Sequence, residues 1–490
     1  MQPLSGLDSS FLYLETDTQP MHVGSVNVYE GSLSFEDFKS FLLERLPLAP
    51  RLFQRLVQVP MSIDHPYWVD DPNFDIDMHL HHTALPRPGD WQALRKLASR
   101  IFAQKLDRNR PLWEFVFVEG LDQISQVPKG SVAVISKIHH AAIDGASGAA
   151  IMGLLFDVTE KPRKIPAMPL PDAEALPGDF TLIRRSAMNY IKRPFKLPGL
   201  LLETAKSTWK AGRLSRVQSK EIPRSILNAP PSILNQPVTS KRLWNSTLLD
   251  LQRVKDLRVG AKGATLNDVV LTICTGALRR YLHEKDALPE KPLVAMIPVS
   301  TRTEGEQDDM GNQVSAMLVQ LPTTEADPVK QLQKVHQHTD QGKAYQNAIG
   351  AKQLIDYTEF IPFALGSAAT RMYTRMNVSN HHRPFFNLII TNVPGPQIPL
   401  YMNGHKMLAN MGMAPVFDGM GLIMPVLSYN GTLSISPTVA ANVMPDVDLF
   451  TQYIRESANE LEANLQALSL KKGSKRSKKK AKPKNKSPKK

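Results

Sequence analysis

The pattern of hydrophobic and polar residues along the chain predicts a mixture of strands and helices. Residues 24–29 and 131–138 are rich in β-branched side chains and are predicted to be strands. Residues 35–46 and 91–106 carry apolar side chains at helical spacing. Beyond residue 238, similar patterns predict a helix at 267–282, strands at 292–298, 313–321 and 386–392, and a hairpin at 421–435 around Asn430-Gly431. We therefore expect an α/β protein of the α+β sandwich type.

Composition changes along the chain divide it into four parts. Residues 1–159 and 238–470 are two α/β halves of similar character. Between them, residues 160–237 form a basic, proline-containing linker, with an amphipathic helical stretch over 180–217. Residues 471–490 contain alanine as their one apolar residue type, so they are expected to be disordered.

The charge of the chain is distributed very unevenly. The formal net charge is +13, yet residues 471–490 alone carry twelve Lys and Arg side chains and no acid. Residues 160–224 add a net +8, which leaves the rest of the chain at about −7. The basic isoelectric point therefore does not indicate that the whole chain binds nucleic acid. With 42% hydrophobic residues, the sequence also excludes wholesale disorder.

Cysteine usage and the N-terminus favour a cytoplasmic protein. Cys274, the single cysteine, cannot form an intramolecular disulfide, and its place on an apolar helix face indicates a core residue rather than a nucleophile. The first residues have no basic and apolar pattern typical of a signal peptide, and no apolar run reaches the length of a membrane span.

The motif with the clearest chemical meaning follows the predicted strand at 131–138. It runs from His139-His140 to Asp144-Gly145, a HHxxxDG string, and a helix of small residues is expected over 146–155. A neutral imidazole at a strand-to-helix turn can remove a proton from a hydroxyl near neutral pH. The pairs His81-His82 and His381-His382 are not followed by Asp-Gly, so they do not share the pattern.

Two other interpretations of the histidine pair compete with a catalytic base. Zinc binding would need a third His, Cys or carboxylate at ligand spacing, and the sequence offers none, so no metal is expected. A purely structural role for the two histidines remains an alternative. The sequence also contains no Gly-x-Ser-x-Gly elbow, no phosphate-binding loop and no Gly-x-Gly-x-x-Gly. A base without a protein nucleophile indicates direct transfer between two substrates.

HHxxxDG within two α/β halves resembles the chloramphenicol acetyltransferase-like superfamily. Further strings narrow the resemblance to the bacterial wax ester synthase/acyl-CoA:diacylglycerol acyltransferase family, over about residues 1–465. One departure is Gly6, where the family pattern has proline. The strings are Pro3-Leu4-Ser5-Gly6-Leu7-Asp8 with Phe11-Leu12, Pro20-Met21-His22-Val23-Gly24, Phe74-Asp75-Ile76-Asp77 through Leu85-Pro86, Arg110-Pro111-Leu112-Trp113-Glu114, Asn267-Asp268-Val269-Val270, Pro298-Val299-Ser300-Thr301-Arg302 and Asn392-Val393-Pro394-Gly395-Pro396.

The resemblance implies two acetyltransferase-like halves joined by a long helical linker, with the active site at their interface. His140 would deprotonate the hydroxyl of a long-chain alcohol or diacylglycerol, which then attacks the thioester of acyl-CoA. No cofactor is implied, because acyl-CoA is a substrate. His139 and Asp144 would support the loop, Gly145 would permit its turn, and Asp144 would pair with Arg302 across the halves.

Two further strings each allow two interpretations. Asn267 and Asp268 either anchor the start of a helix near the site, as a polar residue in a first turn can, or contact substrate. Pro111, Leu112 and Trp113 either pack as a wedge or line a substrate site, and they offer no acid–base chemistry.

The basic segments suggest where the protein is held. The stretch over 180–217 either adsorbs to an anionic membrane or lipid-droplet surface or packs over the domain junction. We expect a cytoplasmic protein, peripheral on the inner membrane face or on lipid inclusions. An alternative function is a non-catalytic lipid-droplet or nucleic-acid tether, with the nucleic acid bound through residues 471–490.

Overall fold

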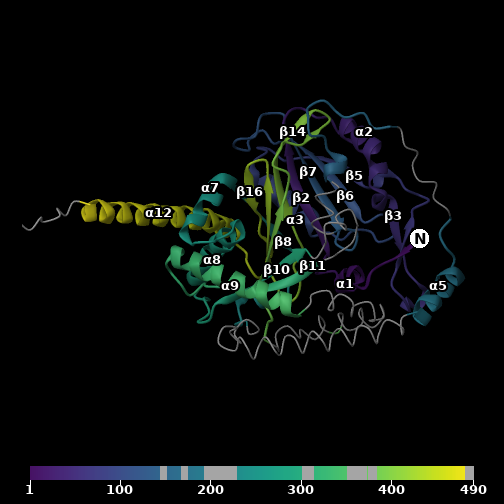
Figure 1. The fold of residues 1–490 in the computed structure, drawn as a ribbon. Coiled ribbons are helices and arrows are strands. Elements are labelled where there is room, and N and C mark those ends of the chain that lie inside the picture. Colours follow the sequence, from purple (N-terminus) through teal and green to yellow (C-terminus); the bar gives the residue numbers. More distant parts are fainter. Residues whose placement is uncertain are drawn as a thin grey trace, which may run out of the picture.

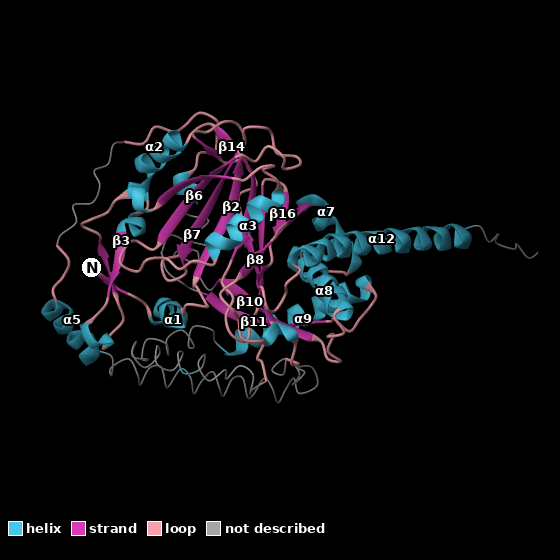
Figure 2. Cartoon of the chain, turned by 180° about the vertical axis from the view of Figure 1, so that it is seen from behind, coloured by secondary structure: helices cyan, strands magenta, loops and turns pink. Residues whose placement is uncertain are grey.

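A computed structural model describes the fold of the chain (Figure 1). It describes residues 1–143, 152–166, 175–192, 229–300, 314–349, 372 and 383–480. Two large β-sheets form the centre of the molecule, and helices α8, α9 and α12 gather at one end of it, away from α2 and α5 (Figure 2).

The first large sheet, here called the N-terminal sheet, has the strand order β13-β14-β2-β7-β6-β5. β7 is therefore an inner strand, with β2 and β6 hydrogen-bonded along its two edges in antiparallel directions. The strands are β2 (His22–Tyr29), β5 (Leu80–Ala84), β6 (Trp113–Glu119), β7 (Val132–His139), β13 (Tyr401–Met402) and β14 (His405–Met413).

Two strands of the N-terminal sheet come from the far end of the chain. β14 pairs with β2 in an antiparallel register that joins Asn410 to Asn27, although the two residues are almost four hundred positions apart. Met411 and Met413 of β14 are buried in the same apolar cluster as Val26 and Ile135. The sheet that carries β7 is thus completed by the C-terminal part of the chain.

The second large sheet, here called the C-terminal sheet, has the order β11-β10-β12-β15-β16-β9, and β17 joins β15 to β8. Its core is continuous with the apolar faces of α8 and α12. The strands are β8 (Arg242–Trp244), β9 (Thr247–Asp250), β10 (Leu293–Ser300), β11 (Val314–Leu321), β12 (Leu388–Pro394), β15 (Leu422–Tyr429), β16 (Thr432–Ile435) and β17 (Thr438–Ala440).

Helices and one small sheet cover these layers. The small sheet has the order β1-β4-β3 and pairs the N-terminal residues Gln2 and Pro3 with β4. Its strands are β1 (Gln2–Pro3), β3 (Gln54–Val57) and β4 (Tyr67–Asp70). The α-helices of the described residues are α1 (Gly6–Leu14), α2 (Phe35–Arg45), α3 (Trp91–Phe102), α5 (Asp179–Lys192), α7 (Leu251–Asp256), α8 (Leu266–Glu284), α9 (Pro328–Ile349) and α12 (Val447–Lys480).

The α/β fold class predicted from the sequence is confirmed, and most predicted elements occur within two residues of their expected ends. The helix predicted over residues 91–106 is too long, because α3 ends at Phe102. Its last turn is capped by the buried ammonium of Lys137, which donates to the carbonyls of Ile101 and Gln104 over 3.4 and 3.1 Å. A cation at a helix C-terminus is favourable, and only tertiary structure brings it there.

The C-terminal tail is partly helical, contrary to the expectation of disorder for residues 471–490. α12 continues as a helix to Lys480 and extends away from the body of the molecule (Figure 1). Lysine is a good helix former, and extending an existing helix avoids the cost of nucleation. Of the predicted amphipathic stretch over 180–217, α5 covers the first part, and residues 193–217 lie outside the described residues.

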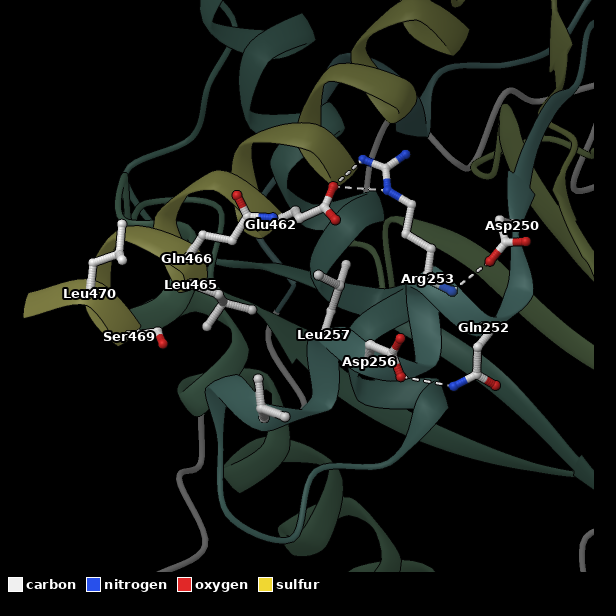
Figure 3. Close-up of a pocket in the computed structure, with 11 residues that line it drawn as sticks. Asp250, Gln252, Arg253, Asp256, Leu257, Glu462, Leu465, Gln466, Ser469 and Leu470 are labelled. Carbon is white, nitrogen blue, oxygen red and sulfur yellow. Dashed lines mark hydrogen bonds and ion pairs between the residues drawn. The ribbon is translucent and has the colours of Figure 1, made fainter. Parts of the chain in front are cut away.

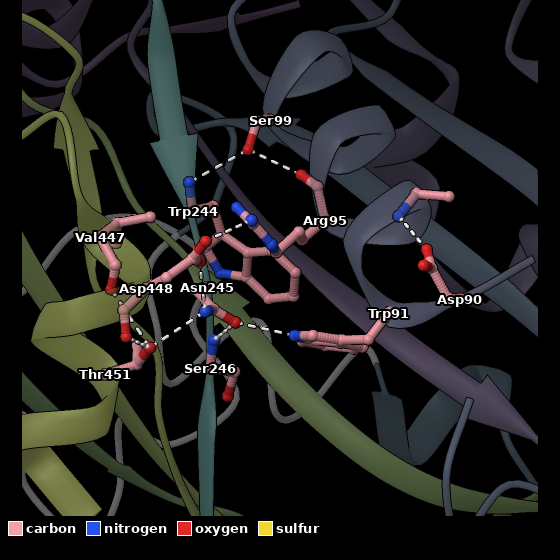
Figure 4. A network of polar contacts seen from close by, with 11 residues as sticks. Asp90, Trp91, Arg95, Ser99, Trp244, Asn245, Ser246, Val447, Asp448 and Thr451 are labelled. Atoms are coloured by element: carbon pink, nitrogen blue, oxygen red, sulfur yellow. Dashed lines mark hydrogen bonds and ion pairs between the residues drawn. The ribbon is translucent and has the colours of Figure 1, made fainter. Parts of the chain in front are cut away.

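A partly buried polar network joins α3, the end of β8 and the start of α12 (Figure 4). The side chain of Asn245, just after β8, accepts a hydrogen bond from the Trp91 indole over 2.8 Å. It donates to Asp448 over 2.9 Å and to Thr451 over 3.0 Å, both in α12. Arg95 of α3 also pairs with Asp448. These contacts hold α3, β8 and α12 in one arrangement.

Candidate active site

The two histidines of the HHxxxDG string lie where β7 ends. The backbone N–H of His139 donates to the carbonyl of Leu112 over 2.9 Å, and that of His140 donates to the carbonyl of Met21 over 2.9 Å. The His139 carbonyl accepts from Ala142, also over 2.9 Å. The backbone of the pair is therefore fixed from the β6 side and from the β2 side of the sheet.

The protonation pattern of His139 follows from its neighbours. The backbone N–H of Ala141 donates to His139 Nδ1 over 3.0 Å, so this nitrogen is an acceptor. In the neutral ring the proton then lies on Nε2, which faces the Oε1 atom of Glu15 at 3.6 Å. The side chains of His139 and Glu15 are 1% and 2% exposed. His139 is thus a buried ring held between a backbone donor and a carboxylate.

Glu15 is an ionised carboxylate inside the protein. Its Oε2 atom accepts hydrogen bonds from Arg108 Nε over 2.9 Å and Nη2 over 2.6 Å, and Oε1 accepts from the N–H of Met21 over 3.3 Å. Burial opposes its charge, but the contacts with His139 and Arg108 outweigh burial and lower the pKa of Glu15 to about 2. The group is therefore negatively charged throughout the neutral pH range.

His140 is the more accessible of the two histidines. It is partly exposed, whereas His139 is fully buried. Its ring stacks on that of Phe11, with centroids 4.0 Å apart and planes inclined by 8°. The imidazole is therefore held flat against the Phe11 side chain of α1.

A second buried histidine lies beside the pair. His22 is opposite His139 in the register of β2 and β7, and its Nε2 atom donates to the carbonyl of Phe102 over 2.6 Å. Burial and the nearby Lys137 ammonium lower the pKa of His22 to about 3. His22 is therefore neutral at pH 7.

Pro111, Leu112 and Trp113 are all buried at the start of β6. The carbonyl of Leu112 accepts the hydrogen bond from the His139 backbone N–H, and the indole of Trp113 donates to the carbonyl of Leu52 over 2.8 Å. Of the two interpretations of this string, the packing wedge is the one that these contacts support.

Asn267 and Asp268 begin α8 and make internal contacts. Asp268 closes a capping box with Thr265 and accepts a 2.6 Å hydrogen bond from Thr339, while Asn267 accepts from Asn392 over 3.4 Å. Burial opposes the charge of Asp268, but its hydrogen bonds keep the pKa of this carboxyl below its usual range. These contacts support the anchoring interpretation for Asp268.

Three predicted site residues, Asp144, Gly145 and Arg302, lie outside the described residues. Four residues that surround the histidine pair were not among the predicted site residues: Phe11, Glu15, Met21 and Arg108. Phe11 and Met21 fall in or beside strings that carry the family resemblance, but no spacing rule connects Glu15 or Arg108 to residues more than thirty positions along the chain.

Other features of the described residues do not coincide with this site. An open groove between α7, the following turn and α12 is lined by Leu257, Val259 and Leu465 and by the Arg253–Glu462 ion pair, and it contains no residue predicted to act in catalysis (Figure 3). No group of three or more metal-ligating side chains occurs within the described ranges. Among those ranges, too, no helix combines the length and apolar character that crossing a membrane requires.

Comparison with known families identifies two matching regions. Residues 4–270 match the family model of the wax ester synthase/diacylglycerol acyltransferase catalytic domain, and residues 310–462 match that of the WS/DGAT C-terminal domain. A putative diacylglycerol O-acyltransferase of Mycobacterium tuberculosis is 32% identical over 468 residues, which cover 93% of this chain and 90% of that protein. The O-acyltransferase WSD of Acinetobacter baylyi is 31% identical, with 93% and 96% covered.

Solved structures show the same relationship. The wax ester synthase/diacylglycerol acyltransferase from Marinobacter aquaeolei VT8 is similar with a TM-score of 0.64 and 27% identity, over 94% of this chain and 99% of that one. The first condensation domain of the calcium-dependent antibiotic synthetase has a TM-score of 0.56 at 15% identity, over 93% and 96% of the two chains. The second likeness concerns the fold alone.

Proposed function

The chain belongs to the wax ester synthase/diacylglycerol acyltransferase family and is an acyl-CoA-dependent O-acyltransferase, and from this premise we propose that His140 is its general base. The observation that carries the proposal is the contrast between the two histidines. His140 is partly exposed and its backbone is fixed at the end of β7, whereas His139 is buried with both ring nitrogens facing protein groups.

The proposed reaction is direct acyl transfer. His140 takes the proton of the acceptor hydroxyl while the oxygen attacks the thioester carbonyl of acyl-CoA. The tetrahedral intermediate collapses, the carbon–sulfur bond breaks, and the imidazolium returns the proton to the departing CoA thiolate. The products are an oxygen ester and CoA, with no acyl-enzyme. A positioned base contributes about 10²–10⁴ in rate, so alignment of the two substrates must supply much of the remainder.

Replacing the base tests this role. The variant His140→Ala should lower kcat for CoA release from palmitoyl-CoA with hexadecanol by about 10²–10⁴. His81→Ala is the matched control, because His81 belongs to an exposed histidine pair on β5 and should leave turnover unchanged. A variant His140→Ala that folds and keeps full turnover would remove the proposal.

The acceptor is proposed to be a long-chain alcohol or a diacylglycerol. Both present one hydroxyl to the same base, so pocket shape decides between them. Product analysis with palmitoyl-CoA against hexadecanol and dipalmitoylglycerol in parallel distinguishes a wax ester from a triacylglycerol. We propose that the enzyme needs no cofactor, since acyl-CoA brings the activated acyl group itself.

The loop after His140 is proposed to be held by an ion pair between Asp144 and Arg302, with Gly145 permitting its turn. Both partners of this pair lie outside the described residues, so the proposal rests on the family resemblance. Arg302→Ala should lower both the unfolding temperature and turnover. If neither changes, the pairing is wrong.

We propose that the protein adsorbs peripherally to an anionic lipid surface on the cytoplasmic side, partly through α5. Phe180 and Met188 on this helix are 79% and 53% exposed, while Leu182 is buried against the small sheet. Two exposed arginines, Arg184 and Arg185, supply the opposite charge to anionic lipid.

Vesicle flotation tests this surface. A double variant, Arg184→Gln with Arg185→Gln, should float less with phosphatidylserine vesicles than the unsubstituted protein. Lys129→Gln with Lys291→Gln removes the same charge from exposed positions elsewhere and serves as the control. Equal flotation of all three proteins would contradict the proposed role of α5.

A further inference from the structure

Phe11 of α1 and Glu15, which caps the C-terminus of α1, contact the histidine pair from positions one helical turn apart. Phe11 stacks on the ring of His140, and Glu15 faces Nε2 of His139. Glu15 is the C-cap of α1, and its N–H donates to the carbonyl of Phe11 over 3.2 Å. Residues four apart lie on the same face of a helix. One face of α1 therefore contacts both rings.

Glu15 also reaches His140 through the backbone of Met21. The N–H of Met21 donates to Glu15 Oε1, and its carbonyl accepts from the N–H of His140. The same carboxylate oxygen thus faces the His139 ring and fixes the residue to which His140 is hydrogen-bonded. Arg108 holds the other oxygen and also donates to the carbonyl of Leu12 over 2.6 Å, which prevents the carboxylate from rotating away.

We propose that Glu15 is a positioning residue for acyl transfer, which keeps His139 protonated at Nε2 and fixes the backbone that presents His140. The inference rests on the proposed role of His140 as general base. Glu15 acts through His139 and Met21 and not by contact with either substrate.

The physical reason lies in the two neighbours of the His139 ring. Ala141 directs an N–H at Nδ1, so a proton on Nδ1 would place two donors against each other. The carboxylate of Glu15 favours the proton on Nε2 and removes this conflict. Without the Glu15 carboxylate, the His139 ring and the turn at residues 139–142 lose a fixed orientation. A misplacement of about 1 Å in a reacting group can cost roughly 10²-fold in rate.

A purely structural role for Glu15 would produce different results. An internal ion pair with Arg108 that only stabilises the fold would leave the tautomer of His139 and the kcat of the folded enzyme unchanged. A kinetic and a spectroscopic measurement therefore distinguish the positioning role from the purely structural role.

The kinetic test uses Glu15→Gln, which keeps the size of the side chain and an acceptor for Met21 but removes the charge. We expect kcat to fall about 10- to 100-fold while KM for palmitoyl-CoA and for hexadecanol stays within about twofold. Asp17→Asn is the matched control, since Asp17 lies two residues away, is 94% exposed and pairs with Lys105. The control should keep kcat. A folded Glu15→Gln enzyme with kcat within about twofold of the unsubstituted protein overturns the inference.

The spectroscopic test examines the full chain labelled with ¹⁵N-histidine, with the His139 signals assigned by comparison with His139→Gln. The unsubstituted protein should show His139 protonated at Nε2, and Glu15→Gln should show a mixture of tautomers. A proton on Nδ1 in the unsubstituted protein overturns the inference, even where Glu15→Gln does not fold. If His140→Ala retains full turnover, the proposed base is wrong; if His140→Ala is inactive and Glu15→Gln is fully active, only the inference about Glu15 fails.

Discussion

Gln19 and Asp418 exchange two hydrogen bonds across 399 positions of the chain. The amide Nε2 of Gln19 donates to Asp418 Oδ2 over 3.0 Å, and the backbone N–H of Asp418 donates to Gln19 Oε1 over 3.2 Å. Both side chains are buried. Gln19 lies two residues before Met21, so this pair attaches the segment that holds the His140 backbone to the C-terminal part of the chain.

Gln19→Ala should therefore destabilise the protein. The substitution leaves a buried carboxylate oxygen without this donor, which costs about 2–3 kcal/mol in the free energy of unfolding. Urea unfolding followed by tryptophan fluorescence measures the change. Gln252→Ala is the control, because Gln252 makes an exposed hydrogen bond to Asp256 within one helix, and it should cost less than about 0.5 kcal/mol. Equal costs for the two variants would contradict the importance of the Gln19 contact.

Glu15 should make stability depend on pH in the acid range. Its pKa is about 2 in the folded protein, below the usual value of 4.5, so the unfolded chain takes up this proton first as the pH falls. The stabilisation is complete above about pH 5 and is lost as the pH falls towards 2; by this shift it is about 3 kcal/mol. Glu15→Gln should flatten the dependence of unfolding free energy on pH within that window. An unchanged slope would show that the carboxylate is not held as described.

His22 should also make the unfolding free energy depend on pH, but at higher pH than Glu15 does. Its folded pKa of about 3 lies below the usual 6.5, so the unfolded chain gains a proton that the folded protein does not accept. Stability is lost as the pH falls from about 6.5 towards 3, by about 2 kcal/mol between pH 7 and pH 5. His22→Gln keeps a donor for the Phe102 carbonyl and does not titrate, so its unfolding free energy should change less over this range. Parallel curves for the two proteins would refute the assignment.

Removal of residues 471–490 should separate surface binding from chemistry. Among the described side chains, the last residues of α12 that belong to the apolar core are Leu461 and, at its edge, Leu465, so the deletion begins beyond this part of the core. Turnover of soluble short-chain substrates should stay within about twofold. Flotation with phosphatidylserine vesicles should weaken at low salt, because each lysine near the surface contributes about 1 kcal/mol. Binding of the full chain to DNA, lost on deletion, would instead assign the tail to nucleic acid. A large fall in turnover would show that the tail takes part in catalysis.

Local patterns in the sequence were sufficient for much of the fold. The β-branched residues at 131–138 identified β7, and the dipeptide Asn430-Gly431 identified the turn between β15 and β16, where both residues have positive φ. Such features depend on side chains within a few positions of one another. The same locality explains why His139-His140 could be placed at a strand end.

The helix end at Phe102 and the surroundings of His139 could not be obtained in this way. Lys137 caps α3 from a neighbouring strand. Glu15, Arg108 and His139 come from three separate parts of the chain and meet only in the folded protein. β14 likewise completes the N-terminal sheet from the opposite end of the sequence.

The sequence by itself determined the family, the α/β class and the identity of the histidine pair, because these follow from ordered motifs and short-range periodicity. Tertiary structure alone decided which of the two rings is buried, which carboxylate faces it and how the end of the chain is attached to the beginning. The physical reason is that hydrogen bonds and ion pairs act over about 3 Å in space, whatever the separation of their partners along the chain.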